Sequence, residues 1–305
     1  EKIGHFLDDE NERLYKECKE NDMDSLATAE YIKNNLDLEN VLKNSFKSVD
    51  GGYNMVGLIG DGNAFVMRDP NGIRPNYYWA NDEVVVVASE RPAIQTAFDL
   101  QMGDLKEVKP GNALIVKRDG SFEEKQIMEP QERLSCSFER IYFSRGSDGK
   151  IHEERKRLGR KISREILTRL DFDIRSTVFS YIPNTAATSY YGLIDGVYKY
   201  LDKWKREQLL KLGSTATAQE IDTLLSVKIR REKLLIKDAK IRTFIAQDEG
   251  RDDLVGNGYD VTYEVVKPTD TLVVVDDSIV RGTTLKKSIL RILDRLGPKK
   301  IIVAS

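Results

Sequence analysis

The sequence predicts an α+β N-terminal half followed by an α/β half with a parallel sheet. From Gly51 onward, short β-type runs alternate with turn residues, and a helical stretch precedes them. Near the C-terminus, residues 271–275 are apolar on both faces, which is typical of a central strand in a parallel sheet. A helical stretch and a second apolar run follow this strand, so the three segments form a predicted β-α-β unit.

In the first half, residues 1–46 are predicted to be helical because their apolar residues recur at loose helical spacing. The runs YNMVGLIG, AFVMRD, EVVVVASE and ALIVKRDG then predict an antiparallel sheet, since Gly-Asp-Gly, Pro-Asn-Gly and Pro-Gly turns lie between them. The polar segment 128–137 is expected to be a connection. We therefore place a domain boundary near residue 137, which gives predicted domains 1–137 and 138–305.

In the second half, HEERKRLGRKISREILTRL predicts a basic amphipathic helix, and TVFSYIPNT predicts a strand that runs into a turn. Residues 195–235 predict two helices around Gly213, with Thr217 and Glu220 as a capping box. This helical pair is either a hairpin packed on the domain surface or a partner-binding element.

The composition excludes several classes of protein. With 305 residues, a formal net charge of -2 and 32% charged residues, the chain has no overall attraction to nucleic acid or to an anionic membrane. Two cysteines and two histidines argue against a disulfide framework and a zinc site. No apolar run is long enough to span a bilayer, and no signal peptide opens the sequence. We expect a cytoplasmic protein, and, since the sequence lacks an initial Met and ends on a bare strand, part of a longer one.

The stretch TLVVVDDSIVRGTT predicts a ligand site. Asp276 and Asp277 follow a buried strand, where ligands of α/β sheets bind, and could face sugar hydroxyls and a divalent metal. The amides of residues 281–284 and the two threonine hydroxyls could hold a phosphate at the start of the next helix. Acidic residues after a strand can also cap the next helix. A Walker-B strand or a phosphoacceptor pocket is a further alternative, but the Gly-x-x-x-x-Gly-Lys-Ser/Thr partner of a Walker-B strand is absent.

The same string resembles the phosphoribosylpyrophosphate (PRPP) motif of type I phosphoribosyltransferases, and in this wording most resembles the amidophosphoribosyltransferases. A second string, VMRDPNGIRP at residues 66–75, would by itself be a hairpin with a local Arg68–Asp69 ion pair. It is similar to a string of that family's glutaminase domain and is likewise followed by Ala-Ser-Glu. FERIYFSRGSD and IRTFIAQ resemble the family's interdomain segment and its flexible loop, so we expect similarity over residues 51–305.

The resemblance assigns site residues one by one. The PRPP-binding residues would be Asp276, Asp277, Ser278, Arg281, Gly282, Thr283 and Thr284. The pyrophosphate loop would contain Asn184 and Thr185, the flexible loop Lys237 and Arg242, and the ligands of Mg²⁺ would be Thr185, Asp276 and Asp277. The family has an acid where this chain has Asn184, so the negative charge is lost there. Segment 236–253 is expected to be a mobile lid.

The resemblance also implies the first committed step of de novo purine nucleotide synthesis. PRPP, glutamine and water become 5-phosphoribosylamine, glutamate and pyrophosphate, purine nucleotides inhibit by feedback, and the enzyme is a homo-oligomer. The fold would be an N-terminal-nucleophile-hydrolase-like remnant followed by a C-terminally truncated type I phosphoribosyltransferase domain, of a divergent branch with an insertion at 195–235. One alternative is a PRPP- or nucleotide-sensing regulatory protein of the same fold. Another is a salvage phosphoribosyltransferase, but that function would leave residues 51–135 without a role.

One part of the family pattern is missing. The family's glutaminase chain begins with its catalytic cysteine, whereas this sequence begins with Glu1. Cys18 and Cys136 lie in other contexts, and neither has a free α-amino group to act as base. We therefore expect a glutaminase domain without its catalytic residues.

We predict that this chain does not hydrolyse glutamine. Without an N-terminal cysteine, no thiolate with an adjacent base divides amide hydrolysis into two accessible steps. The measurement is glutamate release by the purified chain against a no-protein control. Release above that control that disappears on Cys18→Ala or Cys136→Ala would contradict the prediction.

Overall fold

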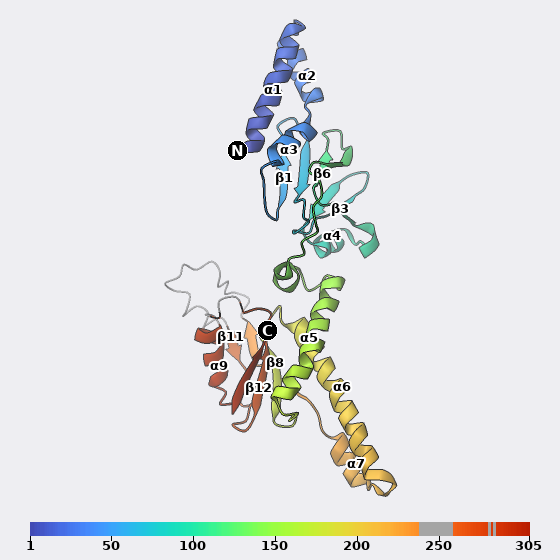
Figure 1. Cartoon of the computed structure of the whole chain (residues 1–305), viewed down its shortest axis with the longest axis vertical. Helices are drawn as coiled ribbons and strands as arrows, with labels where there is room; N and C mark the ends of the chain where they lie inside the picture. Colours follow the sequence, from blue (N-terminus) through green and yellow to red (C-terminus); the bar gives the residue numbers. More distant parts are fainter. Residues whose placement is uncertain (238–258, 280–281, 283–284) are drawn as a thin grey trace. The chain divides into compact units, whose positions relative to one another are not determined.

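The computed structural model describes residues 1–237, 259–279, 282 and 285–305 (Figure 1). The chain divides into two compact units, Glu1–Glu139 and Arg140–Ser305. Between the sheets of the first unit and the junction, residues 128–136 contain neither helix nor strand, and a π-helical turn, Glu139–Phe143, follows. The functional domains 1–137 and 138–305 stay a prediction.

The first unit begins with three helices, which confirms the helical prediction for residues 1–46. They are α1 (Lys2–Glu20), α2 (Ser25–Asn35) and α3 (Leu38–Phe46). Two aspartates set where the second and third helices begin. Asp24 accepts a hydrogen bond from the amide of Ala27 at 2.8 Å, and Asp37 accepts one from Asn40 at 3.0 Å, so each satisfies an otherwise unpaired amide of a first helical turn.

The predicted antiparallel strands follow, divided between two sheets where the sequence predicted one. The first has the order β1-β2-β6-β7, with β1 Asn54–Leu58, β2 Ala64–Arg68, β6 Asn112–Val116 and β7 Phe122–Gln126. The second has the order β4-β3-β5, with β3 Tyr77–Ala80, β4 Val85–Ala88 and β5 Lys106–Glu107, and α4 (Arg91–Phe98) follows β4. Alternate residues of β2 serve two cores, because Phe65 and Met67 pack with Phe46 of α3 and Val66 packs with Tyr78 of β3. The unit is therefore an α+β arrangement.

The second unit is built on a parallel sheet of order β13-β12-β8-β9, which confirms the predicted α/β half. Its strands are β8 Thr177–Tyr181, β9 Arg230–Arg231, β12 Thr271–Val275 and β13 Lys300–Ala304. Strand β12 lies between β8 and β13, and residues 272–275 have at most 1% of their surface exposed. The prediction of a central, fully buried strand from its β-branched run is therefore confirmed.

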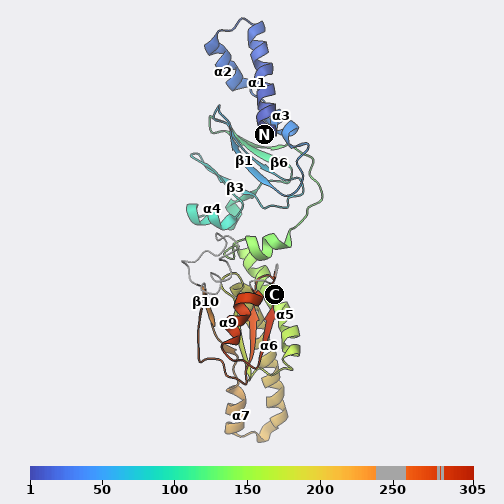
Figure 2. The ribbon, with the colours of Figure 1, turned by 90° about the vertical axis from the view of Figure 1, so that its left-hand side faces the viewer.

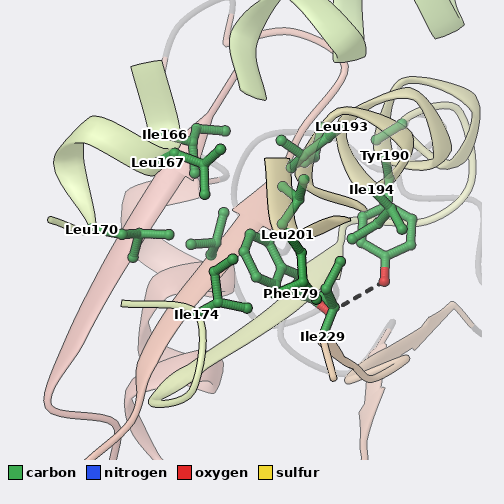
Figure 3. Packing of buried hydrophobic residues seen from close by; sticks show 14 residues of the cluster. Ile166, Leu167, Leu170, Ile174, Phe179, Tyr190, Leu193, Ile194, Leu201 and Ile229 are labelled. Atoms are coloured by element: carbon green, nitrogen blue, oxygen red, sulfur yellow. Dashed lines mark hydrogen bonds between the residues drawn. The ribbon is translucent and has the colours of Figure 1, made fainter. Parts of the chain in front are cut away.

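Helices cover both faces of this sheet (Figure 1). Helices α5 (Gly149–Arg169) and α6 (Ala187–Leu212) pack on one face, where Val273 and Val275 meet the core drawn in Figure 3. In that core the hydroxyl of Tyr190 donates to the carbonyl of Phe179 at 3.3 Å. On the other face, Leu272 and Val274 pack against α9 (Leu290–Asp294) and the π-helical turn before it, Leu285–Ile289.

The predicted helical pair at 195–235 is wrong in two respects. The first helix is the continuous α6, which begins at Ala187, and the second, α7 (Ala218–Leu225), ends well before residue 235. The Thr217–Glu220 capping box is confirmed. After α7 the chain forms β9, which pairs with β8, and then β10 (Leu235–Lys237), which pairs antiparallel with β11 (Tyr259–Val261).

The reason for the error is tertiary. The structure buries Ile229 on one side of the sheet and Leu234 and Leu235 on the other, so this segment packs as part of the sheet layer and not as a helix. Helix α7 lies alongside the C-terminal part of α6 (Figures 1 and 2). Leu210 and Leu225 there are 74% and 49% exposed.

Helices α5 and α6 pack so closely that two glycines are required at their crossing. A Cβ atom on Gly159 would lie 1.8 Å from the carbonyl oxygen of Ser189, and one on Gly192 would lie 1.9 Å from that of Lys156. Both contacts are with backbone, which no side-chain rotation can relieve. The two helices would have to separate to admit even a methyl group.

We predict that Gly192→Ala destabilises the second unit by about 2–4 kcal/mol, because overpacking against backbone outweighs the gain in helix propensity. Denaturant unfolding is followed by the fluorescence of Trp204, which lies on α6, in a Trp79→Phe background. The control is Gly4→Ala in α1 of the first unit, where nothing lies within 4 Å of the added methyl group, and it should leave the unfolding transition reported by Trp204 unchanged. A Gly192→Ala variant as stable as the Gly4→Ala variant would refute the close crossing.

Candidate functional site

The candidate site lies where β8 and β12 end. The two strands are parallel and in register, with Tyr181 opposite Val275, and the amide of Ile182 donates to the carbonyl of Val275 at 2.8 Å. The loops that leave the two strands are therefore neighbours. One contains Asn184 and Thr185 and the other begins with Asp276, so the predicted pyrophosphate loop and acidic pair lie at one edge of the sheet.

Asp276 is held in place by main-chain bonds. Its amide donates to the carbonyl of Ala304 at 2.8 Å, which extends the β12–β13 pairing by one residue, and its carboxylate accepts the amide of Asp277 at 2.9 Å. Burial, together with the charge of Asp277, raises the pKa of Asp276 to about 7. The ionised pair is therefore unfavourable by itself, and a bound cation or a set of hydrogen-bond donors would stabilise it.

Three other residues adjoin this acidic pair. The hydroxyl of Ser278 donates to Oδ1 of Asp277 at 3.2 Å. Burial raises the pKa of Tyr259, the first residue of β11, and the charges of Asp276 and Asp277 raise it further. Burial lowers the pKa of Arg155 on α5, and the charge of Asp277 opposes that shift. The acidic pair is therefore within electrostatic range of a half-buried tyrosine and a buried arginine.

The other predicted site residues are placed only in part. Thr185 is half-buried and Asn184 is exposed, with its carbonyl accepting the amide of Ala187 at the start of α6 at 3.3 Å. Gly282 has φ +69, which suits glycine, and its carbonyl accepts the amide of Lys286 at 2.8 Å. Lys237 ends β10 opposite Tyr259.

Arg242, Arg281, Thr283 and Thr284 lie outside the described residues, as does most of the predicted lid at 236–253. Among the residues that are described, no group of three or more His, Cys, Asp or Glu side chains could hold a metal ion.

The second motif, residues 66–75, has a different role in the structure from the ion pair expected for it. The guanidinium of Arg68, 1% exposed, bonds to Glu107 at 2.8 Å and to the carbonyls of Arg74, Gly72 and Val108. The carboxylate of Asp69 instead accepts the amides of Ile73 and Arg74 at 2.9 and 3.1 Å. Both side chains hold the Pro-Asn-Gly turn in place, so the expected Arg68–Asp69 ion pair is wrong.

The two cysteines differ in their exposure. Cys18 is fully buried in α1, Cys136 is half-buried, and both are free thiols. A buried thiol in apolar surroundings is unreactive.

Sequence reasoning missed two residues of the site, Arg155 and Tyr259. Arg155 is one of several basic residues on its helix, and nothing in the sequence separates it from Arg157, which is exposed. Tyr259 lies in a two-stranded ribbon that was not predicted. Only the folded chain brings them near the acidic pair.

Curated relatives of this chain are amidophosphoribosyltransferases. That of Archaeoglobus fulgidus is 29% identical over 300 residues, which cover 96% of this chain and 56% of the relative. That of Bacillus subtilis is 29% identical and that of Saccharomyces cerevisiae 27% identical, with 87% and 90% of this chain covered and 48% and 50% of the relatives. No protein-family model matches the chain.

Solved structures agree with these relatives. The Bacillus subtilis glutamine PRPP amidotransferase complexed with ADP and GMP has a TM-score of 0.62 and 25% identity, over 95% of this chain and 58% of that one. A structure described as the allosteric regulatory enzyme of purine biosynthesis has a TM-score of 0.61 over 96% and 57%. This chain resembles the amidophosphoribosyltransferases.

The resemblance inferred from the motifs is thus confirmed and is wider than expected. Since it covers 96% of the chain, it extends into the first 45 residues. The chain spans about half the length of the curated amidophosphoribosyltransferases it matches. In the described part of the chain, no helix is both long and apolar enough to cross a membrane.

We predict that Asp69→Ala destabilises the first unit by about 2–3 kcal/mol, because it leaves two amides of a buried turn without an acceptor. Unfolding is followed by the fluorescence of Trp79 on β3 in a Trp204→Phe background. Asp82→Ala, at an exposed position of the same unit, is the control and should change stability by less than about 0.5 kcal/mol. Equal stability of the two variants would contradict the structural role of Asp69.

Proposed function

We propose that this chain is part of an amidophosphoribosyltransferase that converts PRPP, glutamine and water to 5-phosphoribosylamine, glutamate and pyrophosphate. The supporting observation is the acidic pair at the carboxyl end of the central strand of a parallel sheet, in a chain similar over nearly its whole length to enzymes of that name. Under this proposal the first unit is a remnant of an N-terminal-nucleophile-hydrolase fold, and the second unit is a type I phosphoribosyltransferase domain.

Different residues of the proposed site bind different parts of PRPP. Asp276 and Asp277 accept hydrogen bonds from the ribose hydroxyls, since ionised carboxylates are strong acceptors. The turn after them binds the phosphate of PRPP through main-chain amides and hydroxyls, and consists of Ser278, Arg281, Gly282, Thr283 and Thr284. Asn184 and Thr185 adjoin the pyrophosphate, with Lys237 and Arg242 as cations of the flexible loop over it.

A magnesium ion fits the chemistry of this edge. Two carboxylates, one with a pKa raised by burial and by its neighbour, favour a divalent cation, and Thr185 could add a hydroxyl oxygen. Magnesium commonly binds one or two carboxylates together with substrate phosphates. When bound, it would neutralise charge that develops on the departing pyrophosphate.

The protein's own part in the reaction is positioning and exclusion of water. The bond from C1 of the ribose to pyrophosphate breaks as positive charge develops on the sugar, so a nearby carboxylate and fixed dipoles stabilise the transition state. Water competes with ammonia for C1. A closed flexible loop would therefore raise the yield of 5-phosphoribosylamine by keeping water out.

Regulation and assembly are part of the same proposal. The similar Bacillus subtilis enzyme was solved with ADP and GMP, which supports purine nucleotides as ligands of this chain and as feedback inhibitors. We further infer a homo-oligomer in the cytoplasm, with no nucleic-acid or membrane partner.

A second candidate is a PRPP- or nucleotide-sensing protein of the same fold. The observation that favours it is Asn184, which has no charge where the resembled enzymes have an acid. A site with fewer charges for the metal could bind PRPP and turn it over poorly.

The experiment that separates these functions supplies PRPP, MgCl₂ and ammonium chloride and measures the release of pyrophosphate. Release that depends on ammonia supports the transferase. Binding of PRPP in a calorimetric titration with no release supports the sensor. If the folded chain did not bind PRPP, both the transferase and the sensor function would be ruled out.

We predict that Asp276→Asn and Asp277→Asn weaken PRPP binding by about 2–4 kcal/mol, which is roughly 30- to 900-fold in affinity, and leave the fold intact. The pKa of Asp276 is raised in the folded chain, so ionisation costs stability as the pH rises from the unfolded value to about 7. At pH 8 the Asp276→Asn variant should therefore melt at the same temperature as the parent or higher.

Calorimetric titration with PRPP and thermal melts test both parts of this prediction. Asp294→Asn, an exposed position on α9, is the control for the loss of a carboxylate. If both variants bound PRPP like the parent but melted many degrees lower, the two aspartates would be structural caps.

A further inference from the structure

Arg155 is a buried cation that the proposed reaction leaves without a role. It lies on α5 with 4% of its surface exposed, and its guanidinium points to a segment earlier in the chain. Nε donates to the carbonyl of Arg140 at 3.1 Å, and Nη2 donates to the carbonyl of Ser144 at 2.8 Å. One side chain thus holds both ends of the π-helical turn that opens the second unit.

This arrangement is costly unless it has a use. Within the described part of the chain Arg155 forms no ion pair, in contrast to Arg140, whose guanidinium pairs with the carboxylate of Glu154. A buried arginine without a carboxylate partner loses hydration that two carbonyls only partly replace. An uncharged residue could fill the same space at lower cost, so the charge or the planar donor fork must matter.

The position of Arg155 places it beside the candidate site. A Cβ atom built on Gly146 would lie 3.4 Å from Nη1 of Arg155 and 3.8 Å from Oγ1 of Thr188. Thr188 belongs to the first turn of α6, three residues after Thr185 of the predicted pyrophosphate loop. Residues 140–146 therefore adjoin the loop that leaves β8, at the edge of the sheet where β12 ends in the acidic pair.

We propose that Arg155 is a positioning residue that fixes residues 140–146 at the carboxyl edge of the parallel sheet, so that this side of the ligand site is formed before the ligand binds. The bidentate donor fork, rather than the charge alone, is what the two carbonyls require. The identity of the ligand rests on the proposed function, whereas the positioning of the segment does not.

The experiment compares three variants of the full chain. Arg155→Gln removes both the charge and the fork, and Arg155→Lys keeps the charge but cannot reach both carbonyls in the same way. Arg157→Gln, two residues further on the exposed side of α5, is the matched control for loss of a positive charge. Hydrogen–deuterium exchange of the amides in residues 140–146 measures how well this segment is ordered. Calorimetric titration with PRPP and MgCl₂ measures the affinity of the site for PRPP.

In both Arg155 variants we expect exchange in residues 140–146 to accelerate at least about tenfold, with exchange in β8 and β12 unchanged. We expect PRPP to bind at least about fivefold more weakly in both variants, because the segment must then be ordered on binding. Arg157→Gln should match the parent in both measurements.

Other results would overturn the proposal. Unchanged exchange in Arg155→Gln would show that the segment does not depend on this side chain. Restored PRPP affinity in Arg155→Lys, with the segment still loosened, would show that charge alone matters. If both variants unfolded the whole unit, Arg155 would be a core residue and not a positioning residue. If the parent chain failed to bind PRPP, the proposed function would fail, and the exchange result would still decide the role of Arg155.

Discussion

The parallel pairing of β8 with β12 is the constraint on which the rest of the second unit depends. Because Val275 lies opposite Tyr181, the two strands end at the same level, and the loops that follow them must be neighbours. Complete burial of residues 272–275 fixes this register, since a slip by one residue would exchange the two faces that α6 and α9 cover. The crossing of α5 and α6 at Gly159 and Gly192 then sets how closely the helices approach this sheet.

At that edge of the sheet, the candidate site contains ionisable groups whose charged forms are disfavoured. Asp276 and Tyr259 have pKa values raised by burial, and burial lowers that of Arg155, so burial disfavours the charged form of each group. Groups whose pKa values are shifted by burial and by each other are frequent at functional sites. In the first unit, Arg68 and Asp69 are also buried, but their hydrogen bonds are satisfied within the protein. Carbonyls and Glu107 accept from Arg68, and main-chain amides donate to Asp69, which is typical of a structural turn.

The sequence was sufficient for features encoded by neighbouring residues. The β-α-β unit after residue 271, the antiparallel runs after Gly51 and the Thr217–Glu220 capping box were all predictable because period, turn chemistry and capping are local. Strand β9 was not predictable, since its two arginines have no strand pattern. It forms because β8 offers an edge and because Arg230 bonds to the buried Asp270 at 2.6 Å. Arg155 and Tyr259 likewise gain their place only through long-range packing.

The central claim is that the edge where β8 and β12 end binds PRPP. A crystal structure of the chain soaked with PRPP and MgCl₂ tests it most directly. The account predicts ribose hydroxyls within hydrogen-bond distance of the carboxylates of Asp276 and Asp277, and pyrophosphate beside Thr185. PRPP bound elsewhere on the chain, with this edge unchanged and filled only by solvent, would contradict it.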